Sequence, residues 1–185
     1  MRRSMTFALL AASLAGALLL APDQAQAQNA FTSPEGRFTV NFPVQADKSF
    51  NQHEHSSLTG YMADDGNVFY IANYIDYDSP ITDVQEELEG TAEATAAQLN
   101  GKIVSKNFVN FTRGPGGPRK SMEFTFDSTN LTGSGMVIAE SRRSYLVVGF
   151  ARKPYNGVNE INRFLSSFRI TSGGTGGGGR GAGQP

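Results

Sequence analysis

The stretch of residues 58–77 reads LTGYMADDGNVFYIANYIDY, and it carries the strongest fold signal in the chain. Two segments rich in apolar and aromatic residues, 58–63 and 68–77, flank the tetrapeptide Asp-Asp-Gly-Asn at 64–67. An Asp-Gly pair supplies the positive φ angles that a tight hairpin turn requires. The stretch therefore predicts a β-hairpin whose two strands are joined at this tetrapeptide.

Further strands are predicted on both sides of this hairpin. Residues 37–42 alternate apolar and polar side chains and stop before Pro43, which is typical of a strand. Residues 144–151 are apolar on both faces, which predicts a strand at the centre of a sheet. The remaining predicted strands are 103–111, 120–126 and 133–140.

Two helices are predicted among these strands. Residues 82–100 place apolar side chains on one helical face, Thr82 is positioned to cap the start, and Gly101 ends the pattern. Residues 158–167 form a second, shorter helix. The order of three strands, a helix, four strands and a helix predicts an α+β fold. We expect an antiparallel β-sheet of about six to seven strands flanked by two main helices.

Both ends of the chain are predicted to lie outside the folded domain. Residues 1–27 read as a secretory signal peptide, because two arginines precede an apolar stretch and Ala25 and Ala27 match the A-x-A cleavage pattern. The alternative is an uncleaved membrane anchor, but the apolar stretch is shorter than the ~20 residues of a spanning helix. Residues 173–185 are predicted to be a disordered Gly-rich tail. A single globular domain over residues 28–172 is expected, periplasmic or secreted from a bacterium, with no stable membrane anchor after cleavage.

The composition excludes several classes of site. The chain has no cysteine, which excludes disulfides, thiolate metal ligands, cysteine nucleophiles and lipid attachment at a leader cysteine. Its formal net charge of −1 argues against a nucleic-acid partner. No G-x-S-x-G motif is present, and neither histidine has a context suited to orienting a serine. We therefore predict no catalytic residue, no cofactor and no enzymatic activity.

Two groups of residues are candidates for partner binding. Tyrosines on the hairpin strands could form an aromatic sheet face that binds a ligand or partner, although packing in the core and coverage of the sheet edge explain most of them. Basic residues flank the Gly/Pro-rich loop 114–118 and suit an anionic partner, although an exposed hairpin loop with flanking charges is the simpler interpretation. The candidate partner-binding residues are Tyr61, Tyr70, Tyr74, Arg113, Arg119 and Lys120.

The two histidines are the candidate metal ligands. His53 and His55 flank Glu54, and on a strand both imidazoles would share one face. A third protein ligand is not marked in the sequence, and neighbouring polar residues favour a solvated segment. No metal site is therefore predicted.

The two ends of the predicted domain carry a family resemblance. Residues 31–43 read FTSPEGRFTVNFP, which is an aromatic residue, a Ser-Pro-Glu-Gly turn and a strand that ends in proline, and residues 164–168 read FLSSF. Over roughly residues 31–170, the chain resembles the PsbP-like group of α/β/α sandwich domains and their uncharacterised bacterial periplasmic relatives. The resemblance implies a binding or assembly role and transfers no functional residue, because fold does not fix function.

The expected function is that of an exported, non-enzymatic binding or accessory/assembly domain of the bacterial cell envelope. Its partner is an unknown envelope protein or a small ligand. The alternatives are a small periplasmic hydrolase, and a metal-binding protein that acts through His53 and His55.

Overall fold

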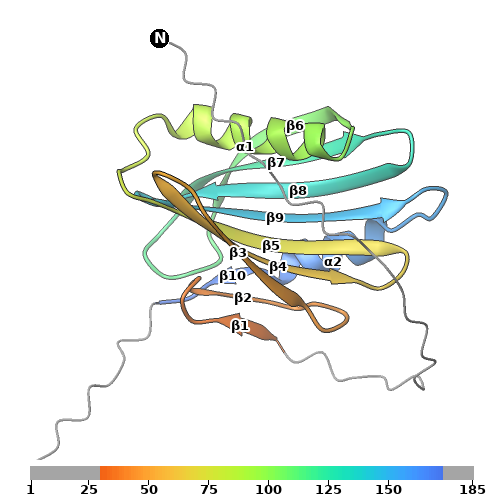
Figure 1. Cartoon of the computed structure of the whole chain (residues 1–185), viewed down its shortest axis with the longest axis horizontal. Coiled ribbons are helices and arrows are strands. Elements are labelled where there is room, and N and C mark those ends of the chain that lie inside the picture. The colour runs from red at the N-terminus through yellow and green to blue at the C-terminus, as the bar shows by residue number, and fades with distance from the viewer. Residues whose placement is uncertain (1–29, 173–185) are drawn as a thin grey trace, which may run out of the picture.

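A seven-stranded antiparallel sheet forms the centre of the molecule (Figure 1). The computed structural model describes residues 30–172. The strand order is β3-β4-β5-β9-β8-β7-β6, and every neighbouring pair is antiparallel. The strands are β3 (Asp47–Gln52), β4 (Ser56–Asp64), β5 (Val68–Tyr77), β6 (Lys102–Phe111), β7 (Arg119–Asp127), β8 (Leu131–Ala139) and β9 (Arg143–Arg152).

A second, three-stranded sheet joins the two ends of the described chain. It consists of β1 (Phe31–Ser33), β2 (Phe38–Val40) and β10 (Arg169–Ile170), in the order β1-β2-β10. The central strand β2 pairs antiparallel with both others. Residues separated by more than 120 positions therefore share one small sheet.

The two helices cover opposite faces of the large sheet. Helix α1 (Val84–Gln98) lies across β6, β7 and β8, whereas α2 (Val158–Ser167) packs on β5, β8 and β9 together with β2 (Figure 1). The architecture is therefore α+β with an antiparallel sheet and two helices, which confirms the predicted fold class.

Each face of the large sheet has its own hydrophobic core. The core under α2 and the small sheet includes Phe38, Tyr145 and Phe168, which are all fully buried. The core under α1 joins Leu88 and its helical neighbours to Phe124 and other side chains of the opposite face. Burial of each such side chain contributes roughly 1.5–3 kcal/mol before entropy is deducted.

Strand β9 divides its side chains between the two cores, as its apolar sequence predicts. Tyr145 and Val147 belong to the core under α2, whereas Leu146 and Val148 belong to the core under α1. It is also the fourth of seven strands, so the predicted central position is confirmed.

The hairpin at residues 58–77 is present, and its turn is held by side chains. Asp64 Oδ1 accepts a hydrogen bond from the Gly66 amide at 2.9 Å, and Asp65 Oδ1 accepts one from the Val68 amide at 2.8 Å. Gly66 has a φ of 96°, the left-handed geometry that glycine adopts without steric cost. The second strand has the predicted bounds, whereas the first, β4, begins two residues earlier than predicted, at Ser56, and ends one residue later, at Asp64.

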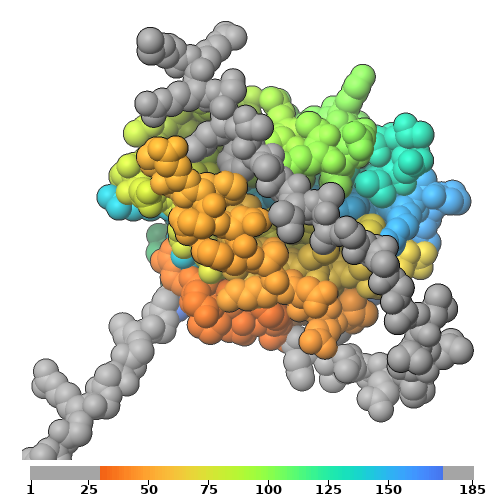
Figure 2. Space-filling model, in the orientation of Figure 1, coloured from red at the N-terminus to blue at the C-terminus, as the bar shows by residue number. Residues whose placement is uncertain are grey.

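Two local predictions differ from the structure. The N-cap of α1 is Asp83 rather than Thr82, because the Asp83 carboxylate accepts the hydrogen bond from the Glu86 amide at 3.0 Å. The edge strand β3 was not predicted, because most of its side chains are exposed and the segment lacks the alternation of a half-buried strand. In Figure 2 the orange residues of β3 and β4 lie at the front surface of the molecule.

Within residues 30–172, neither helix has the length and apolar character needed to cross a membrane. The predicted leader and the predicted Gly-rich tail lie outside the described residues.

Candidate functional site

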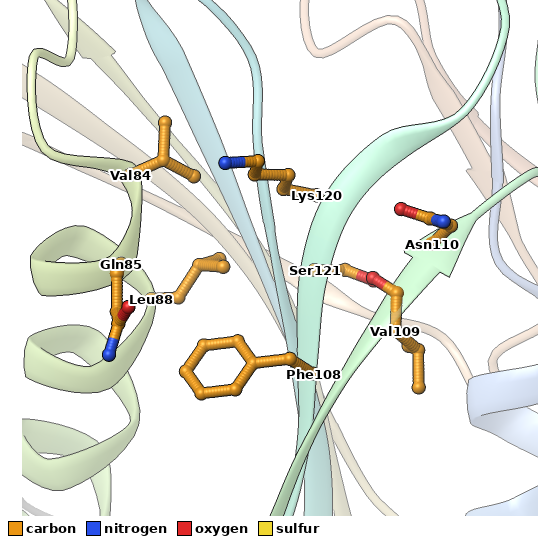
Figure 3. Close-up of a pocket in the computed structure, with 8 residues that line it drawn as sticks. All are labelled: Val84, Gln85, Leu88, Phe108, Val109, Asn110, Lys120 and Ser121. Carbon is orange, nitrogen blue, oxygen red and sulfur yellow. The ribbon is translucent and has the colours of Figure 1, made fainter.

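The candidate site is a cleft of about 320 Å³ between the first turns of α1 and the strands β6 and β7 (Figure 3). Its residues are Val84, Gln85, Leu88, Phe108, Val109, Asn110, Lys120 and Ser121. Figure 3 shows Phe108 and Lys120 pointing from the strands toward the helix, where Val84 and Leu88 face them. The cleft thus has an apolar interior and a basic group at its edge, a composition that is common in ligand sites.

The pairing of β6 with β7 explains why these side chains meet. Asn110 lies directly opposite Lys120, and Phe108 lies opposite Met122 two positions further along. Side chains at alternate positions point to the same face of a sheet. Asn110, Lys120 and Phe108 therefore all project onto the face that α1 covers. Leu88 is 1% exposed and closes the floor, whereas Phe108 remains 48% exposed.

A short polar network ties α1 to β6 beside the cleft. Glu89 accepts hydrogen bonds from Lys106 Nζ at 2.8 Å and from Gln85 Nε2 at 3.0 Å. The hydrogen bonds from Lys106 and then Gln85 lower the pKa of Glu89, and the bond to Glu89 raises the pKa of Lys106. The positive charge of Lys106 is therefore balanced by the carboxylate of Glu89 within the fold.

Lys120 has no such partner. Within residues 30–172 its ammonium group forms no hydrogen bond and no ion pair, and the side chain is exposed. It is the one charged side chain among the residues that line the cleft. Of the six residues predicted to bind a partner, Lys120 is the one that the cleft contains.

The three predicted tyrosines are buried and do not form an exposed aromatic face. Tyr61, Tyr70 and Tyr74 are 5%, 1% and 5% exposed. The Tyr61 hydroxyl is hydrogen-bonded to Ser33 at 3.1 Å, and Tyr70 donates a hydrogen bond to Asp65 at 2.8 Å. The expectation of a tyrosine-lined contact surface is therefore corrected: these rings point into the core under α2 and the small sheet.

Arg113 is used to hold helix α2. Its Nη1 donates a hydrogen bond to the carbonyl oxygen of Leu165 at 3.0 Å, and its guanidinium lies 5.0 Å from the centre of the Phe111 ring. Leu165 belongs to the last turn of α2, where a cation is favoured by unsatisfied carbonyl groups. Burial, followed by the charge of Arg169, lowers the pKa of Arg113. These contacts give Arg113 a role in holding α2 against the sheet.

Arg119 is also engaged inside the fold. It donates to Glu140 Oε1 at 2.7 Å and to the carbonyl oxygens of Pro115 and Gly117 at 2.6 and 3.2 Å. These bonds hold the loop between β6 and β7, and Glu140 is shared with Arg37. Arg119 therefore stabilises the loop that it was predicted to flank.

His53 and His55 lie in the turn between β3 and β4, not on a strand. Both are exposed, and His55 Nε2 is 3.6 Å from the carboxylate of Glu54. Among residues 30–172, no three histidine, cysteine, aspartate or glutamate side chains gather in a way that would hold a metal ion.

Other clefts beside the helices contain polar groups that the fold already uses. In a cleft of about 510 Å³ between α1 and residues 77–83, Glu87 accepts a hydrogen bond from Tyr77 at 2.8 Å. In a cleft of about 410 Å³ beside α2, Asp65 accepts the bond from Tyr70. In the cleft of about 440 Å³ between α2 and β6–β8, Arg113 is held by α2.

Comparison with known proteins assigns no family. No family model matches the chain, and no curated protein matches it. The chain is similar to a crystal structure from Bacteroides thetaiotaomicron VPI-5482 with 10% identity and a TM-score of 0.36, over 77% of this chain and 48% of that one. This chain thus spans about half the length of that protein. A TM-score of this size does not establish a shared fold. None of these comparisons tests the resemblance to PsbP-like domains, which remains a prediction.

Sequence reasoning found Lys120 but missed the residues around it. Val84 and Leu88 were placed on the apolar face of a helix, and Phe108 inside a predicted strand, without any sign that they meet. An aromatic residue amid polar neighbours in KIVSKNFVNF is the one available signal. It does not say which element lies opposite.

Proposed function

We propose that this chain is an exported binding domain of the bacterial cell envelope and acts as an accessory or assembly factor rather than as an enzyme. One observation carries the proposal: Lys120 and Phe108 share a cleft, and the described fold leaves the amine unpaired and the ring half exposed. A partner that covers both groups would bury the ring and supply a negative charge. Such a combination of apolar area and one oriented polar group gives affinity and specificity together.

Export is supported by the sequence at the start of the chain. The predicted signal peptide over residues 1–27 favours a mature domain in the periplasm or outside the cell. The resemblance of residues 31–43 to the PsbP-like opening favours a binding or assembly role.

The lining of the cleft favours binding over catalysis. Ser121 is the one hydroxyl residue there, and its Oγ donates to the carbonyl oxygen of Val109 at 3.0 Å. Lys120 is its neighbour on a strand, so the two side chains point to opposite faces and cannot form a nucleophile–base pair. No histidine or carboxylate lines the cleft beside them.

Site-specific crosslinking tests the proposal. A photo-crosslinking phenylalanine analogue placed at position 108 of the exported chain should give one defined adduct in the native envelope. The matched control is position 50, because Phe50 is 59% exposed on the opposite edge strand β3. We expect Lys120→Gln to weaken the adduct on the order of tenfold, since a charge-assisted hydrogen bond is lost.

Two results would contradict the binding role of this cleft. One is equal crosslinking from positions 50 and 108. The other is an adduct at 108 that Lys120→Gln leaves unchanged while circular dichroism shows both variants folded.

A further inference from the structure

We infer that the cleft under α1 binds a small amphipathic monoanion, namely a carboxylate joined to a short aliphatic or aromatic group. The inference rests on the proposed binding function and names the chemical class of the ligand. It follows from the two walls of the cleft. The strands contribute Lys120 and, further along, Phe108, and α1 contributes the apolar side chains that these two point toward (Figure 3).

The polar end is formed by two neighbouring side chains, one on β7 and one on β6, and Figure 3 shows the Lys120 ammonium extending toward Val84 of α1. Lys120 and Asn110 are direct cross-strand partners, so their Cβ atoms lie about 5 Å apart. Within residues 30–172 neither side chain has a hydrogen-bond partner. The Lys120 ammonium is the group that would pair with a carboxylate, and the Asn110 amide beside it is a further hydrogen-bond donor at the same end of the cleft.

The apolar end begins one alternation further along the strand. Phe108 is two residues before Asn110 on the same face, a spacing of roughly 7 Å. Its ring points toward Leu88, and Val84 lies one helical turn before Leu88 (Figure 3). The cleft of about 320 Å³ holds roughly ten groups the size of a water molecule or a methylene. A carboxylate followed by about five or six carbons therefore fits it.

The charges around the cleft favour one negative charge rather than two. Lys120 is the single cation in the lining, and Lys106 is already bound to Glu89 and lies 3.7 Å from Glu93. A second anionic group placed further along the cleft would approach these two glutamates. Dicarboxylates and phosphate monoesters are therefore disfavoured.

Titration of the exported chain with three probes of matched length tests the inference. Hexanoate, 1-hexanol and hexylammonium would each be added while the backbone amide signals are followed by NMR. We expect saturable hexanoate shifts centred on Phe108, Asn110 and Lys120, about tenfold weaker binding of 1-hexanol, and no binding of hexylammonium. Equal affinity for hexanoate and 1-hexanol, or shifts centred on another cleft, would overturn the inference.

Three variants separate the contribution of the ligand's carboxylate from that of its apolar group. Lys120→Gln should lower hexanoate affinity about tenfold, to that of 1-hexanol, whereas Phe108→Ala should weaken both probes. Lys102→Gln is the matched control, because Lys102 is an exposed lysine outside the cleft, on the edge strand β6 that also carries Phe108. A loss in Lys102→Gln as large as that in Lys120→Gln would reduce the effect to general electrostatics and overturn the site.

The source of the carboxylate is distinguished by a peptide arm. Acetyl-Ala-Ala-Leu with a free carboxylate is compared with its amide. Tighter binding of the free peptide than of hexanoate assigns the carboxylate to the end of a partner chain, and the reverse assigns it to a free acid. Failure of every carboxylate, with the crosslink from position 108 intact, overturns the ligand class and leaves the binding function standing. Hexanoate binding without any crosslink from position 108 supports the ligand class and contradicts the partner-binding function.

Discussion

At the scale of single residues, the fold uses most of the charged side chains that looked available in the sequence. Arg113 and Arg119 donate to carbonyl oxygens of α2 and of the β6–β7 loop, because the planar guanidinium group can satisfy several acceptors at once. Lys120 has a single ammonium on a flexible stem and lies next to that loop without an acceptor. The unpaired charge of the candidate site therefore reflects both the lysine side chain and its position beside the loop.

The N-cap of α1 gives a test at this scale. Asp83→Ala should lower the free energy of unfolding by about 1 kcal/mol, because the Glu86 amide loses its acceptor. Thr82→Ala should change it by less than about 0.5 kcal/mol, since Thr82 makes no capping bond. Urea unfolding followed by circular dichroism measures both. A larger loss from Thr82→Ala would restore the cap that the sequence predicts.

At the scale of elements, strands that are not neighbours are clamped by side chains across the sheet. Arg152 on β9 reaches over β5 to Asp64 on β4, with a shortest contact of 2.8 Å. Its guanidinium lies 4.0 Å from the centre of the Phe69 ring on β5, which provides a cation–π contact. The clamp thus spans three strands next to the hairpin turn.

This clamp predicts a pH dependence of stability. The hydrogen bond from Arg152 holds the pKa of Asp64 below its ordinary value of 3.8. A carboxylate whose pKa is lowered in the folded state stabilises the fold above its unfolded pKa, and this contribution is lost as pH falls through the folded pKa. Asp64→Asn should cost roughly 0.5–1 kcal/mol at pH 7, because the pair is partly solvated.

The difference between Asp64→Asn and the parent should shrink as pH falls through the folded pKa of Asp64, because the parent carboxyl then becomes neutral like the amide. Urea unfolding at pH 7, 4 and 2 measures it. Asp47→Asn is the control, because Asp47 is exposed on β3 and pairs with no side chain of residues 30–172. A constant difference between Asp64→Asn and the parent at all three pH values would show that the loss is not electrostatic.

At the scale of the whole molecule, the start and end of the domain are held together by the small sheet. Strand β10 pairs with β2, and it follows directly after Phe168, which is 0% exposed beside Phe38. The core under α2 is therefore completed only when the last strand is in place.

Truncation tests this closure. A chain of residues 28–172 should unfold with the same midpoint as the full exported chain, because the buried core residues run from Phe38 to Ile170. A chain that ends at Ser167 loses Phe168 and Ile170, at a cost of about 3–5 and 2–5 kcal/mol. This approaches the whole stability of a typical domain, so the shorter chain should be largely unfolded. Cooperative melting of the shorter chain at the parent temperature would contradict the role of β10.

The sequence by itself determined the elements whose signal is local. The Asp-Gly turn at 65–66, the strand with apolar residues on both faces at 144–151 and the periodic helix at 82–100 each reflect backbone geometry or burial that a short segment encodes. These were enough to predict the α+β sheet with two helices, which the structure confirms.

Only the tertiary structure decided which polar and aromatic side chains remain free. For Tyr61, Tyr70 and Tyr74 the strand sequences do not tell whether their face of the sheet is covered, and α2 and the small sheet cover it. Phe108 and Lys120 come together because β6 pairs with β7 in one register and α1 lies across both strands. Burial and partnership depend on elements distant in the chain, and no local pattern records them. The candidate site is therefore a product of packing, whereas the scaffold that holds it is a product of local sequence.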